Sequence, residues 1–206
     1  MKLYDLTLKK EVARECVWGV MGTITRIENK KGESPVLSLI EKEFWEEVNS
    51  LPKKYWEEQQ VKVNRDTIYL NHFINKTKEG VFKGLNNKVL FELGRELKFY
   101  KGIPEIFGKT KELIEKNSIF QEYNIKVEHY IVSTGMVEMI KGSIIKEYVE
   151  DIWGCELIQA KDENGNFEIS EIGYTIDNTS KTRAIFEINK GVNKNTGYDL
   201  SLIHIS

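Results

Sequence analysis

Apolar and polar positions change their spacing at one point in the chain, and this change predicts the elements around it. The stretch Val127–Val132 is apolar and typical of a buried strand, and the polar turn Ser133–Gly135 follows it directly. Apolar residues then recur at helical spacing from Met136 to Val149. Strand, short turn and helix form half of a βαβ unit, in which ligands bind beyond the carboxyl end of the strand. We therefore predict that this turn faces an anion such as phosphate; an ordinary βα turn with a Ser or Thr N-cap is the alternative.

The region before this strand divides into a β-rich part and a helical part. Cys16–Ile27 is apolar and β-rich, and predicts a first strand that runs into a Gly-Thr turn. From Val36 to Lys98 the apolar residues recur at helical spacing, and we expect a break at Asn49–Pro52 and a helix over Asn86–Leu97. Residues 1–34 are therefore expected to belong to a core, and residues 35–100 to form an all-helical block inserted after its first strand.

Residues 101–199 return to an α/β pattern. A helix is expected from Pro104, because proline is favoured in a first helical turn. Two strands, Cys155–Gln159 and Phe167–Ile176, are separated by a segment with Asn-Gly at 164–165, a strong hairpin signal. A last helix is expected from Lys181. The pattern therefore predicts an α/β fold with a parallel sheet core and a helical insertion.

Composition narrows the class of protein. The 206 residues are 40% hydrophobic and 30% charged, which suits one domain with a sizeable insertion. The net charge of -2 and the absence of a basic stripe argue against a nucleic-acid partner. No apolar run approaches the length of a membrane span, and the first residues lack the apolar stretch of a signal peptide, so we expect neither feature. The two cysteines, Cys16 and Cys155, lack metal-ligand spacing. We expect a cytoplasmic, bacterial protein with no membrane partner; its oligomeric state is left open.

Long segments of the chain resemble one family. The order of Ser133 after a strand, Lys181 opening a helix and a helical insertion upstream resembles the haloacid dehalogenase-like (HAD) hydrolases, and most closely a bacterial phosphatase branch. The resemblance implies a Rossmann-like core, a helical cap, and Mg²⁺-dependent phosphoryl transfer from a small phosphorylated metabolite through an aspartyl-phosphate. The segments that carry it are Arg65–Ile74, Phe82–Gly94, Val127–Gly135, Asp151–Glu156 and Ile176–Gly191.

The resemblance also implies roles for individual residues. Ser133 matches the family's hydroxyl position and Lys181 its lysine, and both would hold phosphoryl oxygens as charge develops in the transition state. A lysine in the first turn of a helix lies at the less favourable end for a cation, which favours a functional reason for Lys181. The neighbouring phosphate-binding positions are Thr134, Gly135, Gly22 and Thr23.

Two features depart from the family. Its first motif is Asp-x-Asp-Gly-Thr, but Gly19 and Met21 stand where the two aspartates belong. Neither side chain can attack phosphorus or bind Mg²⁺, so no metal ligand is expected there and the chain as written is expected to be inactive. A non-catalytic phosphate-binding pseudoenzyme and an inactive gene fragment are the alternatives. The last segment, Leu200–Ser206, resembles a translated sequencing adapter. We therefore expect that the native sequence is given only to about Asp199 and that the true protein continues, with the family's acidic fourth motif after that point.

Other candidate residues have structural interpretations. His72 and His129 are expected to be packed or surface residues, and Arg65 and Asp66 a solvated pair. The aromatic residues of the helical block are expected to form its core; they are Phe44, Trp45, Tyr55, Trp56, Tyr69 and Phe73.

Overall fold

The computed structural model describes residues 12–18, 35–97 and 99–191, with the backbone alone described for 12–18 and 35–42. The predicted phosphate-binding positions Gly22 and Thr23, the departures Gly19 and Met21, and the C-terminal segment Leu200–Ser206 lie outside the described residues.

The strands that the structure describes form one four-stranded mixed sheet in the order β1-β2-β3-β4. They are β1 (Val12–Trp18), β2 (Ile125–Met136), β3 (Asp151–Lys161) and β4 (Phe167–Tyr174). The first three are parallel to one another, whereas β3 and β4 form an antiparallel hairpin. Its turn contains Gly165 with a φ of 83°, the left-handed conformation for which the Asn-Gly pair is suited. The α/β class predicted from the sequence is therefore confirmed, and the parallel arrangement holds for β1–β3.

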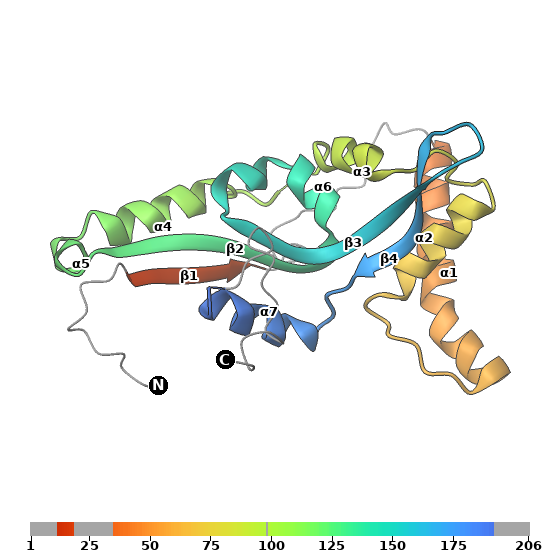
Figure 1. The fold of residues 1–206 in the computed structure, drawn as a ribbon, viewed down its shortest axis with the longest axis horizontal. Helices are drawn as coiled ribbons and strands as arrows, with labels where there is room; N and C mark the ends of the chain where they lie inside the picture. The colour runs from red at the N-terminus through yellow and green to blue at the C-terminus, as the bar shows by residue number, and fades with distance from the viewer. Residues whose placement is uncertain (1–11, 19–34, 98, 192–206) are drawn as a thin grey trace.

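Helices cover both faces of this sheet (Figure 1). Among the described residues, five helices lie between β1 and β2 in the sequence, of which the first three belong to the helical block and the last two lead into β2. A short helix and a 3-10 turn join β2 to β3, and one described helix follows β4. In chain order they are α1 (Pro35–Gln59), α2 (Ile68–Lys78), α3 (Asn87–Gly94), α4 (Glu105–Glu115), α5 (Ser118–Glu122), α6 (Val137–Gly142), η1 (Ile144–Tyr148) and α7 (Ser180–Asn189).

The two faces of the sheet have separate apolar cores. Ile131 packs with Phe107 of α4 and Ile140 of α6 on one face. The next strand residue, Val132, packs with Ala184 and Ile188 of α7 on the other. Successive strand residues point to opposite faces, so this alternation fixes α4 and α6 above the sheet and α7 below it, as Figure 1 shows.

The helical block shares its core with the sheet. Phe44 of α1, Leu70 of α2 and Leu90 of α3 belong to one cluster with Leu157 of β3 and Ile169 of β4. Helices α1, α2 and α3 therefore pack on the β3–β4 hairpin, as Figure 1 shows for α1 and α2.

Helix α1 runs through the break predicted at Asn49–Pro52. Pro52 lies inside it, although a proline in a helix interior costs ~3 kcal/mol or more. The apolar stripe Phe44, Val48, Leu51 and Tyr55 continues across the proline and packs in the shared core. Tertiary packing of this stripe therefore outweighs the local signal for a break.

The prediction of a single helix from Met136 to Val149 is wrong. Strand β2 extends to Met136, α6 occupies Val137–Gly142, and Ser143 then adopts an extended conformation before η1. The Ser143 hydroxyl donates a hydrogen bond to the carbonyl oxygen of Ile140 at 2.7 Å. Serine side chains compete with helical backbone bonds in this way, and the helix ends there.

Two glycines allow α3 and α6 to touch backbone to backbone. A Cβ atom built on Gly94 would lie 2.0 Å from the carbonyl oxygen of Met139, and one built on Gly142 would lie 1.8 Å from that of Phe91. Both separations are far below a van der Waals contact. This contact, visible in Figure 1, fixes α3 on the helix that follows β2.

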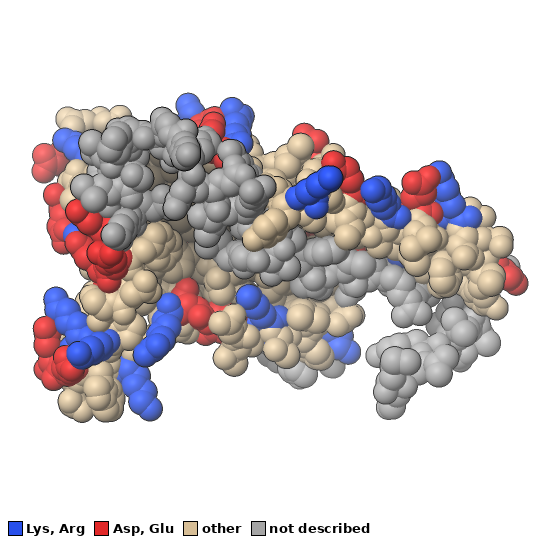
Figure 2. All heavy atoms as spheres, turned by 180° about the vertical axis from the view of Figure 1, so that it is seen from behind, with Lys and Arg blue, Asp and Glu red and all other residues tan. Residues whose placement is uncertain are grey.

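Charged side chains of both signs are interspersed over the face shown in Figure 2. Typical surface ion pairs are Lys111–Glu150, with an Nζ–Oε1 distance of 3.5 Å, and Lys141–Glu138, at 2.7 Å. Within the described ranges, no helix combines the length and apolar character needed to cross a bilayer.

Candidate functional site

Ser133 lies inside β2, at an irregularity in its pairing with β3. Val132 pairs with Trp153 and Met136 with Cys155, so residues 133–135 face Gly154 alone. The Ser133 side chain is buried, and its Oγ accepts a hydrogen bond from the N–H of Gly135 at 3.0 Å. A Cβ atom on Gly154 would lie 2.8 Å from the carbonyl oxygen of Gly135. The turn predicted beyond the strand is therefore a bulge within it, and Gly154 makes room for that bulge.

The carbonyl oxygen of Thr134 in this bulge accepts two hydrogen bonds. The Tyr69 hydroxyl of α2 donates to it at 2.6 Å, and the Cys155 thiol of β3 at 3.3 Å. Burial is the main cause that raises the pKa of Tyr69 above its ordinary value, so its hydroxyl stays protonated as a donor. The helical block thus contacts the predicted phosphate turn directly.

Lys181 is the second residue of α7 and is half-buried. Its Nζ donates to Oδ1 of Asn178 at 3.2 Å. The preceding turn is closed by Asp177, whose Oδ1 accepts the N–H groups of Ser180 at 2.6 Å and of Thr179 at 2.9 Å. The backbone bond from Ser180 is the main cause that lowers the pKa of Asp177. The turn that carries Lys181 is therefore ordered by its own side chains.

Cys155 joins the two predicted segments. Its sulfur donates to the carbonyl oxygen of Thr134 at 3.3 Å and accepts the N–H of Ile176 at 3.4 Å. Ile176 immediately precedes the turn that leads to Lys181. The structure thus brings the Ser133–Gly135 bulge and the start of the Lys181 segment to the same sulfur atom. Within the described residues, no direct hydrogen bond joins Ser133 to Lys181.

The loop between α1 and α2 also forms hydrogen bonds with the turn that carries Lys181. The Asn64 side-chain amide donates to Oδ2 of Asp177 at 2.6 Å. Oδ2 of Asp66 accepts the N–H of Asn178 at 3.0 Å. Asp66, predicted as half of a solvated pair, is therefore engaged by the backbone of a distant turn. No periodic or motif signal marks Asn64 in the sequence, whereas Asp66 lies within a family-like segment.

The two histidines weighed from the sequence are packed. His129 is fully buried, with Nε2 3.1 Å from the carbonyl oxygen of Phe107, and burial is the main cause that lowers its pKa. Nε2 of His72 lies 2.8 Å from Oε2 of Glu47, and its ring lies 5.0 Å from that of Phe44. Both predictions of a structural position are confirmed.

The aromatic residues of the helical block form its core in part. Phe44 and Tyr69 are buried, and Phe73 is half-buried with its ring 4.5 Å from that of Phe44. Trp45 and Trp56, in contrast, are 37% and 47% exposed, so their expected place in the core is wrong.

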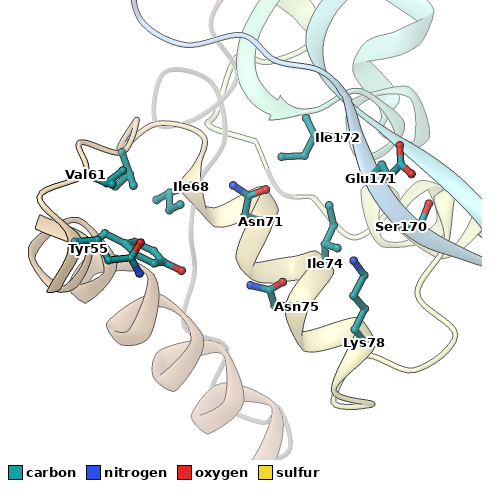
Figure 3. A pocket seen from close by; sticks show the side chains of 12 residues that line it. Tyr55, Val61, Ile68, Asn71, Ile74, Asn75, Lys78, Ser170, Glu171 and Ile172 are labelled. Carbon is teal, nitrogen blue, oxygen red and sulfur yellow. The ribbon is translucent and has the colours of Figure 1, made fainter.

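A groove of about 500 Å³ lies between α1, α2 and β4 (Figure 3). Its lining includes the apolar side chains of Ile68, Ile74 and Ile172 and the amides of Asn71 and Asn75. Its volume is in the range of small-molecule pockets. Neither Ser133 nor Lys181 lines it, so the groove and the predicted phosphate turn are separate features.

The residues present do not fit the Mg²⁺ ion that the family resemblance implies. Mg²⁺ requires oxygen ligands in near-octahedral geometry. Gly19 and Met21 offer no side-chain oxygen, and among the described residues no group of three His, Cys, Asp or Glu side chains is arranged to hold a metal ion.

Comparison with known proteins identifies a relative. An uncharacterized protein of Borreliella burgdorferi is 37% identical over 158 residues, which cover 72% of this chain and 54% of the relative. The chain thus spans about half the length of the curated relative that it matches. No family model matches the chain.

Proposed function

We propose that this chain is built on the plan of a HAD-like phosphatase and retains the half of the site that holds the phosphoryl group of a small phosphorylated metabolite. The observation that carries the proposal is the convergence of the Ser133–Gly135 bulge and the Ile176–Lys181 segment at Cys155. The three parallel strands, with a helical block between β1 and β2, support the same plan.

The side chains of Ser133 and Lys181 are suited to bind the oxygens of a phosphoryl group. Ser133 Oγ accepts the Gly135 N–H and keeps its own hydrogen to donate to a phosphoryl oxygen. Lys181 supplies a positive charge near the start of α7, a position at which the helix dipole disfavours a cation unless an anion lies beside it. A phosphate between the bulge and this helix would compensate that cost. Thr134 and Gly135 complete the proposed cradle.

Titration calorimetry with inorganic phosphate tests this proposal. Charged hydrogen bonds contribute about 1.5–3 kcal/mol, so Ser133→Ala and Lys181→Ala should each raise the Kd at least about tenfold. Ser170→Ala, on β4, is the matched control for Ser133→Ala, and Lys190→Ala, at the end of α7, is the control for Lys181→Ala. Both controls should leave the Kd unchanged. Phosphate binding that is absent, or insensitive to both site variants, would overturn the proposal.

A non-catalytic phosphate-binding protein is the second candidate, and the identities of Gly19 and Met21 favour it. Neither residue can form an aspartyl-phosphate or carry a proton. We expect no Mg²⁺-dependent turnover of p-nitrophenyl phosphate by this chain. Turnover that disappears in Lys181→Ala would contradict this second candidate, as would a genomic sequence with Asp codons at positions 19 and 21.

A further inference from the structure

The contact between the α1–α2 loop and the Lys181 turn joins residues more than a hundred positions apart in the sequence. It consists of two exposed hydrogen bonds, from Asn64 to Asp177 and from the N–H of Asn178 to Asp66. The Asn64 side chain also accepts a hydrogen bond from the N–H of Asp66 at 2.9 Å. This local bond stabilises the conformation of the α1–α2 loop.

Asn178 connects this loop to Lys181 through its backbone N–H and its side chain. Its backbone N–H is held by Asp66 at 3.0 Å, and its side-chain oxygen accepts Nζ of Lys181 at 3.2 Å. A shift of the Asn178 backbone therefore moves the acceptor that holds the ammonium group. Asp66 is three residues before Tyr69, which bonds to Thr134, so the start of α2 contacts both proposed phosphate-holding segments.

We infer that Asp66 is a positioning residue that fixes the Lys181 ammonium group through Asn178. The helical block would then set the location of the positive charge as well as cover the site. That Lys181 contacts phosphate rests on the proposed function, whereas its positioning by Asp66 rests on the contacts above.

The rate at which an amine-reactive reagent labels Lys181, measured by mass spectrometry on the full chain, tests this inference. Removing the acceptor in Asp66→Ala should raise that rate about two- to tenfold, the range expected for one net hydrogen bond. Arg65→Ala, an exposed neighbour in the same loop, should leave it unchanged. Asp66→Asn retains an acceptor oxygen and should restore most of the protection.

A double-mutant cycle tests the route through Asn178. Asn178→Ala should raise the Lys181 labelling rate, and adding Asp66→Ala should raise it no further, because both changes remove the same restraint. An unchanged rate in Asp66→Ala would overturn the inference. An equal rise at Lys190, at the other end of α7, would also overturn it, since Asp66 would then stabilise the fold in general.

A separate arm distinguishes this inference from the proposed function. Inorganic phosphate should slow Lys181 labelling in the wild-type chain if the lysine holds phosphate. If phosphate gives no protection but Asp66→Ala still raises the rate, the proposed function fails and the positioning role stands.

Discussion

Two of the contacts that attach the helical block to the rest of the molecule differ in kind. At the α3–α6 contact, Gly94 and Gly142 allow backbones to meet with no side chain between them. At the Lys181 turn, Asn64 and Asp66 make exposed hydrogen bonds to Asp177 and Asn178. The first contact depends on shape and tolerates no added atom, whereas the second depends on polar groups that also bond to water. The close backbone contact, together with the shared apolar core, therefore holds the block in place, and the exposed hydrogen bonds set finer geometry near the proposed site.

The largest expected effect comes from filling the backbone contact. In Gly142→Ala the new Cβ atom meets the carbonyl oxygen of Phe91, and one of the helices must move. We expect a loss of about 3 kcal/mol or more in the free energy of unfolding, measured by urea denaturation. Gly108→Ala, in α4 with open space around the new atom, is the control and should be neutral or stabilising by up to ~1 kcal/mol. Equal stability of both variants would contradict this account.

Removal of the buried hydroxyl that links α2 to the bulge should have an intermediate effect. Tyr69→Phe removes one of the two donors to the Thr134 carbonyl oxygen and leaves the ring in place. We expect a loss of about 1–2 kcal/mol in thermal or urea unfolding. Tyr55→Phe, on a half-buried tyrosine at the margin of the same core, should change stability by less than ~0.5 kcal/mol. A neutral Tyr69→Phe would show that the bulge does not depend on α2.

The exposed attachment should give the smallest effect, and one that depends on pH. Because the folded-state pKa of Asp177 is lowered, its carboxylate stabilises the fold above the ordinary value of 3.8, and this contribution is lost as the pH falls through the folded pKa. We expect Asp177→Asn to be less stable by about 0.5 kcal/mol at pH 6, after solvent screening, and the difference to vanish at lower pH. Thermal melts at several pH values check this, and a pH-independent difference would contradict it.

The sequence predicts the parts of this molecule that depend on periodicity. The strands around Val132 and Cys155, the Asn-Gly hairpin and the helix carrying Lys181 follow from apolar spacing and turn residues. The α1 helix passes Pro52 because its apolar stripe packs on elements distant in the sequence, and the Ser133–Gly135 bulge depends on Gly154 of the neighbouring strand. The bonds of Tyr69, Asn64 and Asp66 join segments far apart in the chain, which no local pattern encodes.

The location of a bound oxyanion shows whether Ser133 and Lys181 hold a phosphoryl group together. A crystal of the full chain grown with tungstate, a phosphate mimic with strong anomalous scattering, would place that ion without reference to activity. We expect tungstate oxygens within about 3 Å of both the Ser133 hydroxyl oxygen and the Lys181 ammonium nitrogen. An ordered tungstate ion in the groove between α1, α2 and β4, or at any site that lacks both residues, would contradict it.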